Sequence, residues 1–585
     1  MRILGRYFRG YRRESVLAPL FKMLEALLDL LVPIFVAWMI DTDIRSGGMD
    51  RVVWYFAALL GLALLGLGFS VVAQFFAAKA SVGFTGALRQ ALFDHIQTFS
   101  HGELDRLGGD MLITCLADDT NQVQTGLNMS LRLLLRSPFI VFGAMAAAFA
   151  INVRCGLVFL VAIPVLFTVI FLIMKWSIPL FGRVQAGLDK VTALTRENLT
   201  GVRVIRAFCR EAGAVEEFEV SNKGLTRLNL QVGRLSALMN PLTYVLINIA
   251  AVVLIQQSAM EVELGAIPQG QVVALYNYIL QITVELIKLA SLIITLNKSV
   301  ACAKRTAQIL QVQPAMTYPA QDAPEPQPGA PAIAFEDVSF TYPGAGGPSL
   351  SHITFSVGEG QTVGVIGGTG SGKSTLVNLI QRAYDPTQGV VLLRGQRADT
   401  LSRQQLCQMV GVVPQRAMLF QGTIRENLAW GKEDATEEEM WRALTLAQAR
   451  QVVEEKPGGL DFHLEPGGRN LSGGQRQRLT IARAVVKRPD ILILDDSSSA
   501  LDYATDAALR RALYDRAERT TTVLVSQRIA SVRQADLILV LDNGALVGAG
   551  THEQLLEQCP VYRGIYDSQV PEEPQAAGIT GGVQA

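Results

Sequence analysis

Apolar residues are concentrated in the first half of the chain, in stretches near the length of about 20 residues that an α-helix needs to cross a bilayer. Six such stretches are present, at residues 16–40, 53–79, 132–152, 156–176, 236–258 and 271–297. An even number of crossings returns the chain to the side of the membrane on which it started. The pattern therefore predicts a membrane domain of six transmembrane helices over residues 1–310.

The polar links between these stretches alternate between short and long. The two long links follow the second and fourth stretches and have apolar residues at helical spacing among charged ones, as in SVGFTGALRQALFDHIQTF. We expect them to extend the membrane helices into the cytosol. The second long link and the amino terminus MRILGRYFRGYRR are rich in arginine, which places both on the cytoplasmic side. The amino terminus itself predicts an amphipathic helix in the membrane interface.

The pattern changes beyond residue 310. Six prolines between residues 311 and 332 predict an extended linker rather than a core element. From residue 333 to 569, apolar runs such as TVGVIG and DILILD alternate with helical patterns, which indicates an α/β domain with a largely buried sheet. Residues 570–585 are polar, and we expect a disordered tail there.

Composition supports a membrane protein over other classes. Half of the residues are apolar and the mean hydropathy is +0.28, which is unusual for a soluble enzyme of this length. The formal net charge is zero, so no general attraction to nucleic acid is expected. The six cysteines are scattered without paired spacing, which argues against a zinc site or a disulfide framework.

The segment GGTGSGKST follows an apolar strand pattern and opens a helical one, which is the context of a phosphate-binding loop. Its residues are Gly367, Gly368, Thr369, Gly370, Ser371, Gly372, Lys373, Ser374 and Thr375. In such a loop backbone N–H groups close on the phosphates, Lys373 reaches the β and γ oxygens, and Ser374 ligates magnesium. Asp495, at the end of the strand pattern ILILD, is expected to hold the same ion. The predicted ligands are therefore ATP and Mg²⁺.

The motif LSGGQRQR at residues 471–478 is far more specific than the phosphate loop. With it the chain resembles the ATP-binding cassette (ABC) transporters over nearly its whole length, and in particular half-size exporters with one membrane domain and one cassette. The resemblance implies that part of this motif binds the γ-phosphate of a nucleotide held by the other cassette of a dimer. The residues concerned are Ser472, Gly473, Gly474 and Gln475.

The resemblance assigns three further positions. It implies that Tyr342 stacks on adenine, that Gln415 senses magnesium and touches the membrane domain, and that Asp502 lies in a loop that crosses the dimer. The strand context of Tyr342, VSFTYPG, supports the adenine role over that of an ordinary strand tyrosine.

Two positions depart from the family pattern. Fully active members carry Glu after the magnesium-binding Asp and His in the switch loop, whereas this chain has Asp496 and Gln527. Asp is one methylene shorter than Glu, and a misplaced base costs about 10² to 10⁴ in rate. Gln cannot become cationic or shuttle a proton. The segment EPGGRN before LSGGQ also resembles one half of heterodimeric bacterial exporters, so the sequence predicts their degenerate-site subunit.

Polar residues in the last apolar stretch suggest a substrate cavity. They recur on one helical face, at Asn277, Gln281, Glu285 and Lys288. Because polar groups facing lipid are costly, this face should meet a water-filled cavity or another helix. Contact with substrate and a structural Glu285–Lys288 ion pair both remain open. For Glu25 and Asp29, in the first stretch, packing is the favoured role.

These expectations combine into a half-size ABC exporter in a bacterial cytoplasmic membrane, with both termini and the cassette in the cytoplasm. It would export small amphipathic molecules, drug-like or lipid-like, and pair with a second half-transporter that carries the usual Glu and His. Hydrolysis would then occur mainly at the partner's site. The alternatives are a slow homodimeric exporter of lipid or peptide, and a regulatory ATP-binding membrane protein without transport.

Overall fold

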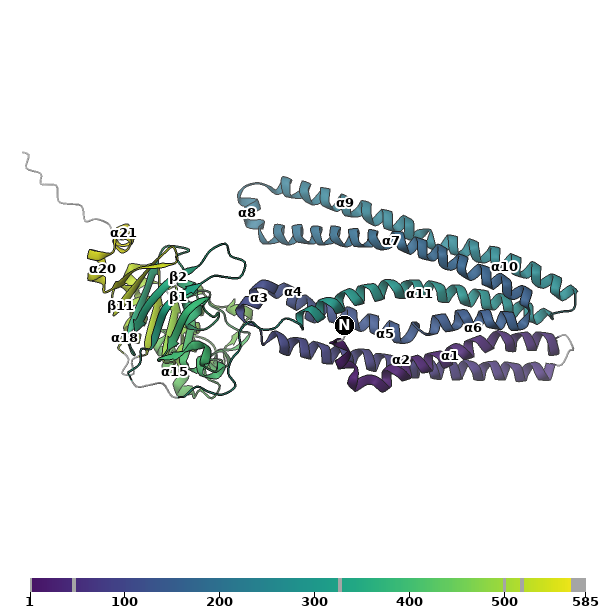
Figure 1. Cartoon of the computed structure of the whole chain (residues 1–585), viewed down its shortest axis with the longest axis horizontal. Coiled ribbons are helices and arrows are strands. Elements are labelled where there is room, and N and C mark those ends of the chain that lie inside the picture. The colour runs from purple at the N-terminus through teal and green to yellow at the C-terminus, as the bar shows by residue number, and fades with distance from the viewer. Residues whose placement is uncertain (1–2, 45–48, 325–328, 498–500, 516–519, 570–585) are drawn as a thin grey trace, which may run out of the picture. The chain divides into compact units, whose positions relative to one another are not determined.

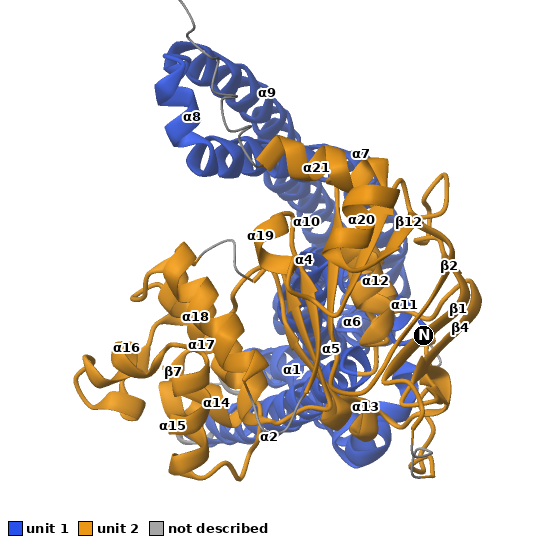
Figure 2. Cartoon of the chain, turned by 90° about the vertical axis from the view of Figure 1, so that its left-hand side faces the viewer, with its two compact units in different colours: residues 1–97, 108–312 blue, residues 98–107, 313–585 orange. Residues whose placement is uncertain are grey.

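The computed structural model describes residues 3–44, 49–324, 329–497, 501–515 and 520–569, so the tail predicted at residues 570–585 lies outside them. The chain forms two compact units (Figure 2). The first comprises Met1–Gln97 and Gly108–Val312, and the second comprises Thr98–Leu107 and Gln313–Ala585. The short segment Thr98–Leu107 thus belongs to the second unit, although the chain on either side of it belongs to the first.

The described part of the first unit is helical (Figure 1). Its elements are η1 (Leu4–Tyr11), α1 (Arg12–Trp38), η2 (Met39–Ile44), α2 (Met49–Ile96), α4 (Gly109–Thr114), η3 (Cys115–Asp119), α5 (Thr120–Leu133), α6 (Arg136–Ile151), α7 (Val153–Thr200), α8 (Val202–Ala207), α9 (Glu211–Ala237), α10 (Met239–Glu263) and α11 (Gln269–Ile309).

Six helical segments among the described residues are long and apolar enough to cross a membrane. They are Leu4–Asp41, Val52–Ile96, Gly109–Ile151, Val153–Thr200, Glu211–Glu263 and Gln269–Ile309. The prediction of six membrane helices is confirmed. Helices α2 and α7 have 48 residues each, far more than the roughly 20 that a bilayer requires, so they continue well beyond it.

The amino-terminal segment η1 packs against neighbouring helices of the first unit. Leu4 is buried, and Tyr7 and Phe8 pack against the same apolar cluster as Phe84. The ring centroids of Phe8 and Phe84 are 4.2 Å apart. The position of this segment in the membrane interface stays a prediction.

The second unit is an α/β structure, as predicted, and it contains two main sheets (Figures 1 and 2). Its strands are β1 (Ile333–Phe340), β2 (Leu350–Val357), β3 (Thr362–Gly367), β4 (Gln388–Leu393), β5 (Gln396–Arg397), β6 (Val410–Val413), β7 (Gly422–Thr423), β8 (His463–Leu464), β9 (Ile491–Asp495), β10 (Thr521–Val525), β11 (Leu537–Asp542) and β12 (Ala545–Gly550). One sheet has the order β12-β11-β3-β10-β9-β6, and an antiparallel sheet has the order β2-β1-β4-β5.

The other elements of the second unit are helices and short helical turns. They are α3 (His101–Leu107), α12 (Lys373–Ile380), η4 (Ala398–Thr400), α13 (Arg403–Met409), α14 (Ile424–Ala429), α15 (Glu437–Leu446), α16 (Arg450–Glu454), η5 (Gly459–Asp461), η6 (Pro466–Gly468), α17 (Gly473–Val486), α18 (Tyr503–Tyr514), α19 (Ile529–Val532), α20 (His552–Gln558) and α21 (Pro560–Gln569).

Strand order determines where the site forms. Strands β3, β10, β9 and β6 are neighbours and run parallel, so their carboxyl ends lie at one edge of the sheet. Every residue in β9 except the last is fully buried, which explains the uninterrupted apolar run ILIL. In such sheets ligands bind outside the carboxyl ends of the strands. The ends of these four strands and the loops after them carry the phosphate loop, Gln415, Asp495, Asp496 and Gln527, whereas Tyr342 and the LSGGQ residues lie in other segments.

Candidate functional site

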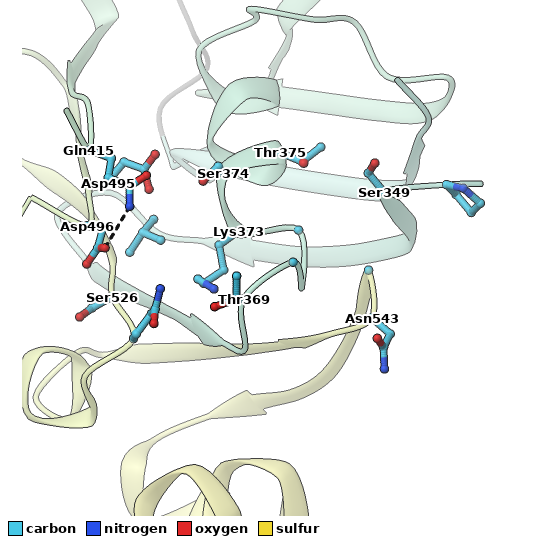
Figure 3. Close-up of a pocket in the computed structure, with 16 residues that line it drawn as sticks. Ser349, Thr369, Lys373, Ser374, Thr375, Gln415, Asp495, Asp496, Ser526 and Asn543 are labelled. Carbon is cyan, nitrogen blue, oxygen red and sulfur yellow. Dashed lines mark hydrogen bonds between the residues drawn. The ribbon is translucent and has the colours of Figure 1, made fainter. Parts of the chain in front are cut away.

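A cavity of 510 Å³ lies at this edge of the sheet (Figure 3). It is lined by Pro348, Ser349, Thr369, Gly370, Gly372, Lys373, Ser374, Thr375, Gln415, Asp495, Asp496, Val525, Ser526, Gln527, Asn543 and Gly544. Figure 3 shows Gln415, Asp495 and Asp496 together on one side of the pocket and Ser349 and Asn543 on the other. The structure thus brings together predicted residues from four separate loops.

The phosphate loop depends on glycine at two positions where the backbone is left-handed. Gly370 has φ 81° and Gly372 has φ 99°, a conformation that other residues adopt only with strain. A Cβ on Gly372 would also lie 2.8 Å from the carbonyl oxygen of Ser349. The loop therefore turns tightly into helix α12, with its backbone N–H groups available for an anion.

Lys373 makes hydrogen bonds within the phosphate loop. Its Nζ donates hydrogen bonds to the carbonyl oxygens of Gly367, at 2.9 Å, and Gly368, at 2.7 Å. Burial lowers the pKa of this ammonium group, and the nearby Asp496 and Asp495 oppose that effect. A phosphate would restore the charge balance of this partly desolvated cation.

Asp495 and Asp496 follow each other at the end of β9. Burial raises the pKa of Asp495, and the charge of Asp496 adds to the effect, against the opposing attraction of Lys373. Asp496 has a left-handed backbone with φ 44°, and its N–H donates to the carbonyl of Val525 at 3.0 Å. Nε2 of Gln415 donates to Oδ2 of Asp496 at 3.3 Å.

The residues of the pocket fit a magnesium ion. Ser374, Asp495 and Gln415 all line the cavity and carry hydroxyl, carboxylate and amide oxygens, the ligand types that Mg²⁺ prefers. The hydroxyl of Ser371 is buried and has no hydrogen-bond partner among the described residues. An orphaned polar atom within the phosphate loop is consistent with a partner that a bound ligand would supply.

Tyr342 lies beside the pocket and is not one of its lining residues. Its hydroxyl is 3.3 Å from Oγ1 of Thr375 in the phosphate loop. The rings of Phe340 and Tyr384 pack edge-on against it, with centroid distances of 4.8 and 5.2 Å.

The LSGGQ residues lie apart from this cavity, and none of them lines it. Ser472 caps helix α17 in a reciprocal pair with Gln475, and a Cβ on Gly473 would meet nothing within 4 Å. Asp502 caps helix α18 by accepting from the N–H of Thr505, which holds the pKa of Asp502 below its usual value. The chain therefore presents an open helix amino terminus that could bind an anion from another molecule.

Sequence reasoning missed several lining residues. Ser526 adjoins the switch position at the end of β10, and Ser349 precedes β2. Asn543 and Gly544 form the two-residue turn between β11 and β12, both with positive φ. The dipeptide Asn-Gly is a strong signal for such a hairpin turn, so the turn was predictable, although its position beside the phosphate loop was not.

The polar face of α11 is occupied mainly by contacts within the first unit. Glu285 is 3% exposed and accepts hydrogen bonds from Arg136, Ser137 and Lys288. Nε2 of Gln281 donates to the carbonyl of Asp29 at 3.2 Å. The remaining member of the face, Asn277, donates a hydrogen bond to a backbone carbonyl of its own helix.

Six charged side chains form one network in this region. Its members are Lys22, Glu25, Asp29, Arg136, Glu285 and Lys288, three cations and three anions from three helical spans. Arg136 is central, with Asp29 at 2.8 Å, Glu25 at 3.8 Å and Glu285 in direct contact. The side chains of Asp29 and Lys288 are each 42% exposed, and the other four are largely buried. Full mutual pairing explains how an apolar bundle tolerates these charges.

Comparisons with known proteins find relatives that match nearly the whole chain. The ABC transporter transmembrane region matches residues 15–286, and the ABC transporter domain matches residues 350–499. The uncharacterized ABC transporter ATP-binding protein Rv1273c of Mycobacterium tuberculosis is 36% identical over 572 residues, covering 97% of this chain and 98% of the relative. The probable multidrug resistance ABC transporter ATP-binding/permease protein YheI of Bacillus subtilis is 29% identical over 576 residues, covering 97% of each.

A solved structure has the same fold. The structure of a bacterial Atm1-family ABC exporter with ATP bound matches with a TM-score of 0.80 and 23% identity, covering 96% of this chain and 99% of that chain. At this level of identity the likeness concerns the fold alone.

Proposed function

The chain belongs to the ABC transporters, as an exporter-type half-transporter with a membrane domain fused to an ATP-hydrolysing domain, and we propose that it is the degenerate-site half of a heterodimer. One observation carries this proposal. Asp496 and Gln527, the two departures from the family pattern, line the same phosphate pocket. Both alterations therefore affect the γ-phosphate of one nucleotide, the one held by this chain's own phosphate loop.

Each altered residue weakens hydrolysis in a different way. The carboxylate of Asp496 is one methylene shorter than Glu and receives a hydrogen bond from Gln415, which limits its use in polarising an attacking water. Gln527 supplies an amide in place of an imidazole, so it cannot carry the positive charge that would stabilise the transition state. ATP would be bound in this pocket and hydrolysed slowly.

The remaining nucleotide-binding residues support tight binding of ATP. The loop from Gly367 to Thr375 would hold the phosphates, Lys373 would pair with them, and Tyr342 would stack on adenine. Ser374, Asp495 and Gln415 would hold Mg²⁺, which when bound neutralises phosphate charge.

The intact LSGGQ segment supports a role in trans. Ser472 and the glycines that follow it form a free helix amino terminus outside this chain's own pocket. In a face-to-face dimer, with Asp502 in the connecting loop, this terminus would complete the partner's site. A partner with Glu and His would therefore hydrolyse ATP at a site to which this chain contributes Ser472, Gly473, Gly474 and Gln475.

Exposed apolar residues in both units support a partner subunit. Val204 and Phe208, at the tip where α7 turns through α8 into α9, are exposed. In the second unit Met418, Phe420 and Trp430 are also exposed, and the last two stack at 4.7 Å. Clusters of this kind on a cytoplasmic surface are typical of protein interfaces. We infer that both clusters are covered in the assembled transporter.

We propose small amphipathic molecules as the exported substrates. A cavity of 290 Å³ between α7 and α11 is lined by apolar and aromatic side chains such as Phe171 and Leu286, with Lys175 as its one charged lining residue. This lining suits a molecule with an apolar body. The printed name of YheI, a probable multidrug resistance protein, supports the same class. The three partners of Glu285 favour its structural alternative, which leaves Asn277, Gln281 and the half-exposed Lys288 as candidate contacts.

Reconstitution tests this proposal. The chain and a second half-transporter carrying Glu and His would be placed in inside-out vesicles, and uptake of cationic, neutral and anionic amphipathic dyes would be measured with ATP. We expect uptake with both subunits and ATP, and little with either subunit alone. ATP binding without uptake of any dye class by the pair would favour a regulatory protein. Full uptake by this chain alone would favour a homodimer.

A further inference from the structure

The segment Thr98–Leu107 is attached to the rest of the second unit by hydrogen bonds that two of its carboxylates accept. Glu103 is buried and accepts from the N–H of Ala315, at 3.3 Å, at the start of the linker. It also accepts from the N–H of Ser100, at 2.9 Å. Burial works against ionisation, but these hydrogen bonds hold the pKa of Glu103 below its usual value. Glu103 therefore anchors α3 to the linker.

The second attachment is made by Tyr384. Its hydroxyl donates a hydrogen bond to Oδ2 of Asp105, which lies on the exposed side of α3. The ring also lies against the same helix, since a Cβ on Gly102 would be 3.8 Å from Cε1 of Tyr384. Burial and the carboxylate of Asp105 raise the pKa of the Tyr384 phenol. The hydroxyl therefore stays protonated and donates at neutral pH.

The ring of Tyr384 also contacts Tyr342, the residue expected to stack on adenine. Tyr342 and Tyr384 meet edge to face, with centroids 5.2 Å apart and an interplanar angle of 84°. Phe340 packs against both rings. The hydroxyl of Tyr342 is 3.3 Å from Oγ1 of Thr375, in the phosphate loop. Direct contacts thus run from the phosphate loop through two tyrosines to α3.

We propose that Tyr384 is a positioning residue that transmits nucleotide occupancy from Tyr342 to Asp105 of α3. The proposal rests on the proposed function in one respect, because it takes Tyr342 as the residue that stacks on adenine. A base stacked on Tyr342 would fix the orientation of that ring. Since packed aromatic rings have few alternative arrangements, Tyr384 would be fixed in turn, and its hydrogen bond would hold Asp105.

The consequence reaches the membrane helices through the covalent chain. Helix α3 follows α2 after a link of only four residues, 97–100, and precedes α4 directly. A change in how firmly α3 is held therefore acts on the ends of two helices of the first unit. Coupling between nucleotide binding and α3 requires a group of side chains with two arrangements, and the nucleotide must favour one of them.

Hydrogen exchange of α3 tests the proposal. The full-length chain in detergent would be labelled with and without Mg²⁺ and ATP, and exchange followed in the peptide covering residues 98–107. The variants are Tyr384→Phe, which keeps the ring and removes the hydroxyl, Asp105→Ala, which removes the acceptor, and the two combined. Tyr318→Phe is the control, since its ring lies under Arg382 and its hydroxyl has no described role here. ATP affinity would be measured for each.

We expect ATP to slow exchange in this peptide of the wild type by about fivefold or more, the lower end of usual couplings between sites. Tyr384→Phe should reduce the effect below about twofold and, because coupling between two sites is reciprocal, should weaken ATP binding by no more than about fivefold. The slowing of exchange by ATP should be no smaller in the double variant than in either single variant, because each single variant already removes the same hydrogen bond.

Two results would overturn the proposal. One is a wild-type response to ATP in Tyr384→Phe. The other is exchange in the wild-type peptide that ATP does not slow. Neither readout requires a partner subunit or transport, so failure of the heterodimer proposal would be seen separately, in the vesicle assay.

Discussion

Gln415 donates a hydrogen bond to Asp496 on one side of the phosphate pocket, at 3.3 Å. The two residues follow neighbouring strands, β6 and β9, so the contact joins the loop expected to sense magnesium to the position where active relatives are expected to carry the catalytic glutamate. The side-chain amide of Gln415 and the carboxylate of Asp496 lie next to Asp495 in the pocket (Figure 3). In this arrangement Asp496 is better suited to holding the loop in place than to activating water.

Asp495→Asn should stabilise the nucleotide-free protein. The pKa of Asp495 is raised on folding, so the fold favours the protonated form, and this stability is lost as pH rises through the raised pKa. At pH 7.5 the neutral amide avoids that cost, and we expect the melting temperature to rise by roughly 2–4 °C, the change produced by about 1 kcal/mol in a domain of this size.

The same variant should lose the additional stabilisation that Mg²⁺ gives to the ATP-bound protein. Differential scanning fluorimetry with ATP, with and without the metal, measures both effects. A lower melting temperature for the nucleotide-free Asn variant would show that the fold favours the ionised carboxylate and would contradict a raised pKa of Asp495.

Arg136→Met should destabilise the membrane domain far more than Lys288→Met. Arg136 faces Glu25, Asp29 and Glu285 in a buried setting, and breaking a buried pair costs about 3–5 kcal/mol. The half-exposed Lys288 contributes less, about 1 kcal/mol or below. The measurement is the fraction of monodisperse protein that survives graded heating in detergent.

Adding Glu285→Gln to Arg136→Met should recover part of the loss, because one uncompensated charge is removed. Equal stability of the two single variants would contradict the central place of Arg136 in the network.

Gly126→Ala should be destabilising, although alanine usually stabilises a helix relative to glycine by about 0.5–1 kcal/mol. A Cβ at this position would lie 2.3 Å from the side chain of Ser299, so α5 and α11 would have to separate. We expect a loss of about 1–3 kcal/mol, as for other overpacked sites. Gly86→Ala is the matched control, because a Cβ there meets nothing within 4 Å. Equal thermal stability of the two variants would refute the close helix approach.

The sequence predicted those features that local patterns determine. The length of the apolar stretches predicted the six membrane helices. The phosphate loop was found because it follows an apolar strand, and Asp495 because it is the last residue of another. Neighbouring carboxyl ends in a parallel sheet then account for the gathering of Lys373, Gln415 and Asp496 in one pocket.

Features that depend on contacts between distant segments were not predicted. Helical periodicity placed Glu285 on a polar face, but its partner Arg136 is 149 positions away, and periodicity carries no information on such a pair. Likewise, no pattern around Thr98–Leu107 indicated that it belongs to the second unit. Its partner Tyr384 is 279 positions from Asp105.

Steady-state ATP hydrolysis by the purified heterodimer tests the central claim most directly, by comparing Ser472→Arg with Asp496→Ala in this chain. Ser472→Arg alters the site completed in the partner, so we expect ATPase to fall by about 10² or more, as when a positioned transition-state donor is lost. Asp496→Ala affects only this chain's own pocket, and the fall should be less than about fivefold, or roughly 1 kcal/mol. Loss of activity in Asp496→Ala with little effect of Ser472→Arg would mean that Asp496 is the working base and that this chain does not hold the degenerate site.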